Sequence, residues 1–453
     1  MKFSVNSLAS RFFSKKLRIS QEPDCKVYKR RWLILAIFVV YSTSNAMQWI
    51  QYSIIANVAM EYYGVSSTWI DWTSMIYMIT YIPLIFPASW ILDKWGLRVA
   101  CLVGSAGTCL GAWIKLGSVS PDRFYVAFIG HSIVACSQVF VLSVPARLAA
   151  VWFGPDQVSS ACSIGVFGNQ LGVAIGFLFP PMIVKSHEDI NEIGADLQFM
   201  YYIVAGITTL VFIAIVTVFQ AAPPLPPSSA QAAQRTSEQV PFLKSVKKLV
   251  TNSGYMLLLV SYGINVGVFY AISTLLNQVV LDYFPGKEED AGRIGLTIVV
   301  AGMVGSVICG IALDKTHKFK EVTLVVYVFS LIGMLIYTFT LQSGYIAVVY
   351  FTGGLLGFFM TGYLPVGFEF AAELTYPEPE GTSAGLLNAS SQVFGILFTI
   401  FYSFLFNTYK DLVANGALSG ALLLGSVLTA LIRAELRRQK AHAKPVSPAK
   451  EKY

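Results

Sequence analysis

Long apolar stretches recur along most of this chain, and each is long enough to cross a lipid bilayer as a helix. A membrane-spanning helix needs about 20 predominantly apolar residues. Helices and closed barrels are the structures that satisfy every backbone polar group inside a bilayer, so repeated stretches of this length predict an all-α polytopic membrane protein. We predict twelve spans, at residues 32–60, 69–92, 97–118, 123–149, 157–184, 197–220, 254–284, 291–313, 321–341, 344–372, 381–407 and 412–434.

Composition excludes the main alternatives to a membrane protein. Charged residues make up 13% of the 453 residues and hydrophobic residues 55%, whereas soluble chains carry about 25% charged residues. Six cysteines in this length do not make a secreted disulfide scaffold. No nucleophile–base pair and no cluster of metal ligands stands out, so we expect no enzyme activity, no cofactor and no bound metal.

The positions of Lys and Arg predict which side of the membrane each loop faces. With the amino terminus inside, 26 of the 32 Lys and Arg lie on inner segments and six on outer loops, Lys115 and Lys185 among them. Basic residues collect on the cytosolic side of membrane proteins, so both termini are predicted to be cytosolic. This topology explains the net charge of +7 without a nucleic-acid partner, and the basic clusters suit contact with the anionic lipids of the bilayer.

A segment rich in Pro, Ser, Ala and Gln divides the predicted spans into six and six. It ends in a basic amphipathic stretch, 242–250, which suits a short helix on the inner membrane surface. We expect a basic N-tail (1–31), an N-terminal bundle (32–220), a cytosolic linker (221–253), a C-terminal bundle (254–435) and a basic C-tail (436–453).

The two halves resemble each other at a nearly constant offset. An offset of 221 residues places Trp49 on Tyr270, and one of 222 places Gln170 on Gln392. This register predicts a duplicated six-helix unit with two pseudo-symmetric bundles. Parallel repeats of this kind place a substrate site at their interface near the midplane, and rocking of the two bundles gives alternating access.

The same four residues lie near the centres of their spans, where we find no charged side chain. Midplane carboxylates are typical of proton-coupled carriers, so their absence favours facilitated diffusion, although carbonyls and amides could still hold Na⁺. Trp and Tyr faces attract an organic cation by about 2 kcal/mol each when desolvated. We therefore predict that Trp49 and Tyr270 clamp an organic cation, with Gln170 and Gln392 on its polar part. The alternative is that all four only pack between helices.

The inner end of the second span carries a motif, Leu92-Asp-Lys-Trp-Gly-Leu-Arg98. It resembles the G-x-x-x-D-x-x-G-R-[RK] signature of the major facilitator superfamily, with Ser89 and Leu97 as departures. The resemblance implies that Asp93 pairs with Arg98 or Arg147 and latches the outward-open state, and a solvated turn is the alternative. With the second copy of the motif and the register mate of Arg147, the predicted cytosolic gate consists of Asp93, Arg98, Arg147, Asp314, Lys315 and Glu369.

Longer segments throughout the membrane portion resemble the feline leukaemia virus subgroup C receptor-related family of this superfamily. The segments are 45–53, 81–87, 111–115, 151–155, 168–172, 273–278, 362–369 and 380–388. The resemblance implies transport of choline and ethanolamine, with haem export as an older assignment, and it implies a substrate site at Trp49, Gln170, Tyr270 and Gln392. It also suggests cavity-lining roles for Asn45, Met75, Tyr77 and Met78, which helical spacing alone would assign to packing.

The residues themselves favour choline over haem. A haem carrier needs Arg or Lys for two propionates and a ligand near the iron, whereas the span centres lack basic residues and contain one histidine, His131. We predict a facilitative choline and ethanolamine uniporter, with a haem exporter and a non-transporting receptor or scaffold as alternatives. We expect a monomer in the plasma membrane, with the endoplasmic reticulum or mitochondrion as open alternatives.

Overall fold

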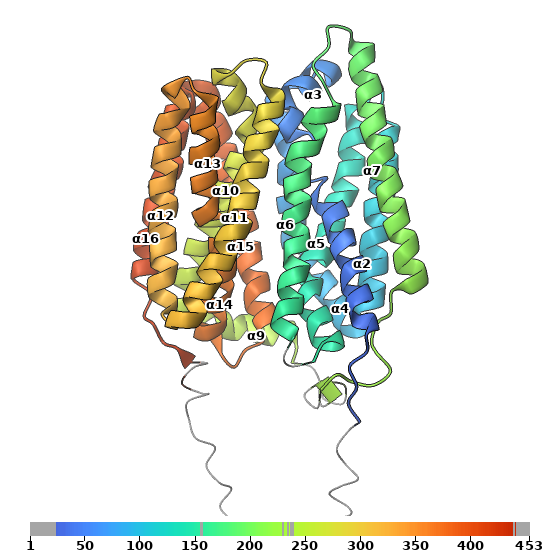
Figure 1. Cartoon of the computed structure of the whole chain (residues 1–453), viewed down its shortest axis with the longest axis vertical. Helices are drawn as coiled ribbons and strands as arrows, with labels where there is room; N and C mark the ends of the chain where they lie inside the picture. Colours follow the sequence, from blue (N-terminus) through green and yellow to red (C-terminus); the bar gives the residue numbers. More distant parts are fainter. Residues whose placement is uncertain are drawn as a thin grey trace, which may run out of the picture.

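The computed structural model describes residues 24–154, 157–228, 231–232, 235, 240–437 and 440. The regular structure of this part is helical throughout. Figure 1 shows two bundles of long helices standing side by side, one built from each half of the chain. The described ends of the chain lie at the same end of the molecule, as expected if both face the cytosol (Figure 1). Residues 1–23 of the predicted N-tail and 441–453 of the C-tail lie outside the described residues.

The amino-terminal bundle begins with a broken crossing and ends before the linker. Its helices are α2 (Arg30–Ala46), η1 (Ser53–Ile55), α3 (Ala56–Tyr63), α4 (Ser67–Leu116), α5 (Phe124–Trp152), α6 (Val158–Ile183) and α7 (Ile190–Val218).

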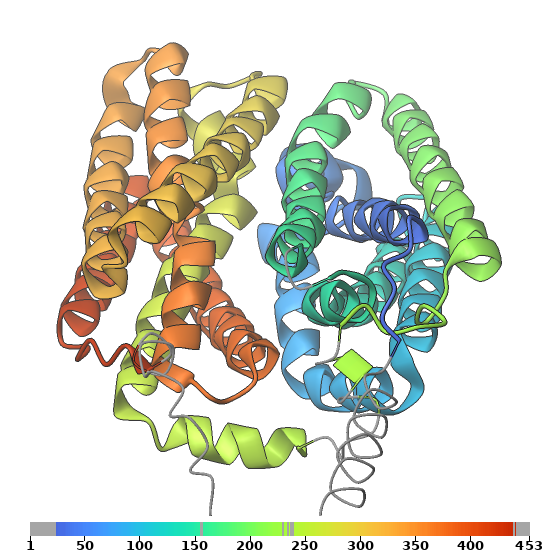
Figure 2. The same cartoon turned by 60° about the horizontal axis from the view of Figure 1, so that its bottom comes forward.

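The linker contributes one short helix, and the carboxy-terminal bundle follows it. Helix α9 (Phe242–Val250) has the bounds of the amphipathic stretch noted in the sequence, and Figure 2 shows it lying across the end of the C-terminal bundle. The bundle contains α10 (Ser253–Tyr283), α11 (Glu288–Thr316), α12 (Phe319–Thr340), η2 (Leu341–Ser343), α13 (Ile346–Met360), α14 (Tyr363–Thr375), α15 (Glu380–Tyr409) and α16 (Asp411–Ala430).

Helix α4 holds two crossings joined at a glycine. Its 50 residues are far too many for one crossing of a core about 30 Å thick. Gly96 has φ +86° and ψ −177°, a conformation that glycine adopts without a Cβ clash, and it turns the chain back between the spans predicted at 69–92 and 97–118. The glycine of the sequence motif is therefore the residue that allows this sharp turn.

The first predicted span is not one helix, so the expectation of a continuous helix over 32–60 is wrong. Helix α2 ends at Ala46, residues 47–52 form turns, and the chain resumes as η1 and α3. Glycines of α6 allow that helix to approach the turns closely, because a Cβ on Gly176 would lie 2.7 Å from the Met47 carbonyl oxygen. The span predicted at 344–372 is likewise divided into α13 and α14.

Ten helical segments of the described chain are long and apolar enough to cross a membrane. Helix α4 supplies two crossings, and the broken α2–α3 segment supplies one more, which gives the twelve predicted crossings. Large apolar side chains such as Leu210, Phe351 and Phe404 lie on the outer surface at 60–74% exposure. Such a surface is unfavourable in water and suits contact with lipid.

Candidate functional site

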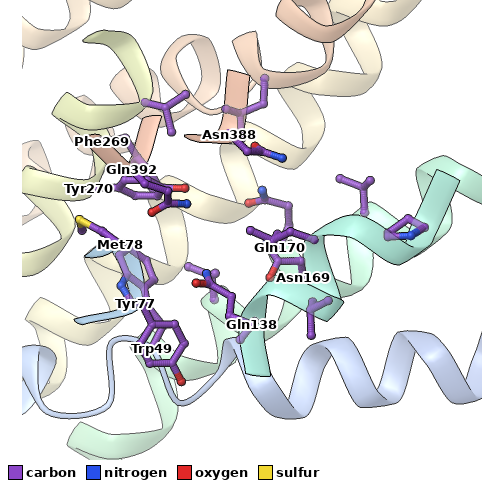
Figure 3. Close-up of a pocket in the computed structure, with 18 of the residues that line it drawn as sticks. Trp49, Tyr77, Met78, Gln138, Asn169, Gln170, Phe269, Tyr270, Asn388 and Gln392 are labelled. Atoms are coloured by element: carbon purple, nitrogen blue, oxygen red, sulfur yellow. The ribbon is translucent and has the colours of Figure 1, made fainter. Parts of the chain in front are cut away.

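A cavity of about 110 Å³ lies between the two bundles. Its walls come from the 47–52 turns, α4, α5 and α6 on one side and from α10, α14 and α15 on the other. All four residues that the sequence singled out, Trp49, Gln170, Tyr270 and Gln392, line it (Figure 3). The structure thus brings together side chains that are more than 300 positions apart in the sequence.

Two aromatic rings meet across the bundle interface at one end of this cavity. The ring centroids of Trp49 and Tyr270 lie 5.5 Å apart at 69°, an edge-to-face contact. Gly395 of α15 leaves room for it, since a Cβ there would lie 2.8 Å from Tyr270 and 2.9 Å from Met78. A cation in contact with one ring lies up to about 6 Å from that ring's centroid. The two centroids here are only 5.5 Å apart, so no cation fits between the rings. The expected clamp is therefore closed in this conformation, and a cation meets the rings from the cavity side.

Five amide side chains line the cavity among apolar side chains. Besides Gln170 and Gln392, the lining includes Gln138, Asn169 and Asn388, which sequence reasoning missed (Figure 3). Oε1 of Gln138 and Nε2 of Gln392 are buried and have no hydrogen-bond partner in the protein. An unpaired buried polar atom costs about 1–3 kcal/mol. One free acceptor and one free donor at the same cavity point to a small ligand that can both donate and accept.

The four cavity-lining candidates divide into two pairs. Tyr77 and Met78 line the cavity, and Asn45 and Met75 do not. The Asn45 amide donates to Thr108 Oγ1 at 3.0 Å and to the Val134 carbonyl at 3.3 Å, so it faces the core of its own bundle. Met75 is also buried in the core. Asn45 and Met75 therefore act through packing in this conformation.

Four charged residues that we assigned to loops or span ends are buried, and two of them, Lys115 and Asp71, bond polar side chains of another segment. Lys115 was expected in an outer loop, but it lies in the last turn of α4 and is 1% exposed. Asp71 is equally buried, because α10 and α15 cover the beginning of α4: its carboxylate accepts from Gln278 Nε2 at 2.9 Å and from Ser403 Oγ at 2.8 Å. Neither residue lines the cavity, and no charged side chain is among its described lining residues.

Within the described residues, most hydrogen bonds between the bundles lie on the extracellular side of the aromatic pair, whereas Ala389 of α15 packs against the core of the N-terminal bundle on its cytosolic side. Besides Asp71 and its two partners, Ser74 and Thr274 share a hydrogen bond of 2.8 Å. Nδ2 of Asn277 donates to the Ile54 carbonyl at 2.9 Å and to Asn57 Oδ1 at 3.2 Å. The cavity itself runs from the aromatic pair into the cytosolic half of the bundles, where Pro145 and Phe368 line it. The conformation is therefore closed outside and faces inward.

The six residues of the predicted cytosolic gate lie three in each bundle. Arg147 Nη1 lies 3.1 Å from Asp93 Oδ1, so Asp93 pairs with Arg147 of the two candidates. Both belong to the N-terminal bundle, so in this conformation the pair does not join the bundles. Arg98 instead donates to the carbonyls of Val216 and Phe219 at the end of α7. The remaining three, Asp314, Lys315 and Glu369, are exposed on α11 and α14.

Comparison with known proteins decides the family. Residues 34–399 match the Major Facilitator Superfamily. The zebrafish (Danio rerio) choline/ethanolamine transporter flvcr2b is 55% identical over 93% of this chain and 87% of its own. Human choline/ethanolamine transporter FLVCR2 is 53% identical over 92% and 80%. The cat (Felis catus) choline/ethanolamine transporter FLVCR1 is 51% identical over 92% and 75%. This chain belongs to the FLVCR family of the major facilitator superfamily.

Solved structures of much lower identity share the fold of this FLVCR family member. The Escherichia coli fucose:proton symporter FucP is 14% identical and matches with a TM-score of 0.62 over 89% of this chain and 98% of its own. An inward-facing, unoccupied bacterial homologue of the lysosomal transporter Spinster is 13% identical and matches with a TM-score of 0.65 over 92% and 98%. The expected family, the two-bundle fold and the multi-pass membrane location are thus confirmed, and the chain is a transporter by family and not an enzyme.

Proposed function

We propose that this FLVCR family member carries choline and ethanolamine across the plasma membrane by facilitated diffusion. The observation that carries the proposal is an uncharged cavity between two bundles whose closed end is formed by Trp49 and Tyr270. Relatives that are 53–55% identical over the aligned residues are named choline/ethanolamine transporters, which supports the choice of substrate.

The chemistry of choline suits this lining. Its trimethylammonium group has no N–H to donate, so aromatic faces and not carboxylates are its natural partners. Its hydroxyl is both a donor and an acceptor. Gln138 Oε1 and Gln392 Nε2 are the free acceptor and donor at the cavity, so the two amides are the natural partners of that hydroxyl. In ethanolamine the ammonium offers three N–H donors, for which the oxygens of Gln170 and Asn388 are further acceptors.

Haem and a scaffold role are both less well supported. None of the described lining residues is Lys, Arg or His, so two propionates would enter without a charged partner and the iron without a histidine. The cavity is also below the roughly 300–1,000 Å³ typical of drug-sized ligands. A scaffold that no longer transports would have a filled, apolar interface, whereas this interface contains unpaired amide atoms.

Alternating access follows from the position of the contacts. Release to the cytosol occurs from this inward-facing conformation, and loading from outside requires Ser74 to separate from Thr274 and Asp71 from Gln278. The lining offers no carboxylate or histidine to carry a proton with the substrate, which supports facilitated diffusion.

Uptake of radiolabelled choline and ethanolamine tests the proposal, with haemin efflux measured in the same cells. We expect Trp49→Ala and Tyr270→Ala each to lower choline uptake at least tenfold at unchanged surface expression, since each removes a cation–π face worth about 2 kcal/mol. Tyr202→Ala, on the outer surface of α7, is the matched control and should leave uptake unchanged. Normal uptake in both site variants would rule out the aromatic site, and haemin efflux without choline uptake would favour the haem alternative.

A further inference from the structure

A buried lysine contacts the broken part of the first crossing. The Lys115 ammonium donates to Gln48 Oε1 at 3.1 Å and to Gln51 Oε1 at 2.9 Å. It also lies 5.6 Å from the centroid of the Tyr52 ring, within cation–π range. These three residues belong to one short run of turns, and Trp49 is in the middle of that run.

Burial of the Lys115 ammonium is unfavourable in free energy, so its partners must compensate for the lost hydration. Burying an ammonium costs several kcal/mol even after relaxation. Lys115 is 1% exposed, and within the described residues no ion pair is recorded for it. Its charge is therefore stabilised by amide oxygens and a ring that the broken segment supplies. A lysine that only filled space would be replaced by methionine at lower cost.

The broken segment needs such support because its own backbone bonding is weak. Gln48 N bonds the Asn45 carbonyl and Trp49 N the Ala46 carbonyl, both at 3.2 Å, and Gln51 N bonds the Gln48 carbonyl at 3.4 Å. These are three-residue steps with poorer geometry than the four-residue bonds of an α-helix. The side-chain bonds from Lys115 therefore add to the close packing that holds residues 47–52 in one conformation.

Helix α5 also packs against Lys115, and helix α7 bonds Tyr52 of the turns. Glycines bring α4 and α5 together beside the lysine, since a Cβ on Gly130 would lie 3.1 Å from Lys115 Cγ. The Tyr52 hydroxyl shares a bond of 2.8 Å with the Tyr201 hydroxyl of α7. The His131 ring lies 5.2 Å from the rings of both Tyr52 and Tyr77, which connects this support to the cavity wall.

We infer that Lys115 is a positioning residue for substrate binding: it fixes the 47–52 turns so that the Trp49 ring is held at the closed end of the cavity. The inference rests on the proposed function for its substrate, but the geometry it describes does not depend on which molecule is carried. Lys115 does not touch the cavity, so it acts through Trp49. Tyr270 needs no counterpart, because it lies on the continuous helix α10.

Hydrogen–deuterium exchange on the purified full chain tests the inference without any substrate. We expect Lys115→Met, which keeps length and loses the donors, to speed amide exchange in residues 47–55 about tenfold. Gln51→Leu removes one acceptor and keeps the lysine, so it should speed the same exchange severalfold and serves if Lys115→Met does not fold. Thr209→Val is the control, because Thr209 accepts from Trp113 of α4 at 2.7 Å and the described residues show no hydrogen bond between it and the turns. Unchanged exchange in Lys115→Met and Gln51→Leu would overturn the inference.

Choline uptake then tests whether Lys115 acts through Trp49. We expect Lys115→Met to raise the KM for choline about tenfold with a smaller change in maximal rate, and Lys115→Arg to recover part of the loss. In a Trp49→Phe background, Lys115→Met should change KM less than twofold, because the Trp49 ring that Lys115 positions has been replaced. An equal effect in both backgrounds would show an independent structural role. If the unmodified chain takes up no choline, the proposed function fails while the exchange result still stands.

Discussion

At the scale of single residues, the proposed function gives Gln138 the role of recognising the hydroxyl of the substrate. Its buried Oε1 lacks a partner in the protein and lines the cavity. We predict that Gln138→Leu raises the KM for choline about tenfold, because a hydrogen bond from a buried hydroxyl is lost. Competition by tetramethylammonium, which has no hydroxyl, is the internal control and should be unaffected. Equal weakening of both ligands would mean that the substitution distorts the cavity.

Comparison of the two halves of the sequence predicted the cavity residues that align with a residue of similar chemistry in the other half. It missed those that align with an unrelated residue. Trp49 matches Tyr270 and Gln170 matches Gln392, and all four line the cavity. At the same offset of 222, Gln138 falls on Met360. An asymmetric polar residue gives no signal in a comparison of the halves, although its position near the centre of the span at 123–149 could have revealed it. The burial of Lys115 was missed because its partners, Gln48 and Gln51, lie on turns that read as helix.

At the scale of elements, the turn at Gly96 can be tested directly. Its φ of +86° with extended ψ belongs to a region that is essentially restricted to glycine, and a side chain there costs about 1–3 kcal/mol. We predict that Gly96→Ala lowers the melting temperature of the purified protein by several degrees. Gly385→Ala, in α15 with no atom within 4 Å of a new Cβ, should not lower it. Equal melting temperatures for Gly96→Ala and the parent would show that this turn is not under strain.

Hydropathy predicted where the chain crosses the membrane but not how the backbone runs inside it. The apolar windows gave twelve crossings because the length needed to span a bilayer is fixed. They could not separate α2 from α3. Residues 47–52 form turns whose side-chain amides bond to neighbouring helices, and their composition does not differ from that of a membrane helix. The break is decided by contacts from α4 and α6, which are distant in sequence.

At the scale of the whole molecule, the proposed alternating access implies that the extracellular contacts set the balance between inward- and outward-facing states. We predict that Asn277→Ala shifts the population toward the outward-facing state by about tenfold, because the side chain loses its bonds to the Ile54 carbonyl and to Asn57. Spin labels at the outer ends of α7 and α12 would report this as a longer mean distance. Thr340→Val is the control, because Thr340 bonds Thr352 within one bundle. An unchanged distance distribution would show that contacts other than those of Asn277 stabilise the inward-facing state.

The neutral lining of the cavity has an electrical consequence. A monovalent organic cation carried alone moves one net charge in each loaded step, and the empty carrier returns with none from its lining. Transport is then electrogenic, and a voltage negative inside pulls the substrate inward with about 2.3 kcal/mol per 100 mV. At equilibrium that voltage alone would hold the cation roughly fifty-fold more concentrated inside, since each 1.4 kcal/mol is a factor of ten. On the proposed mechanism, a carrier whose cavity lining is uncharged thereby uses the membrane voltage as its energy source.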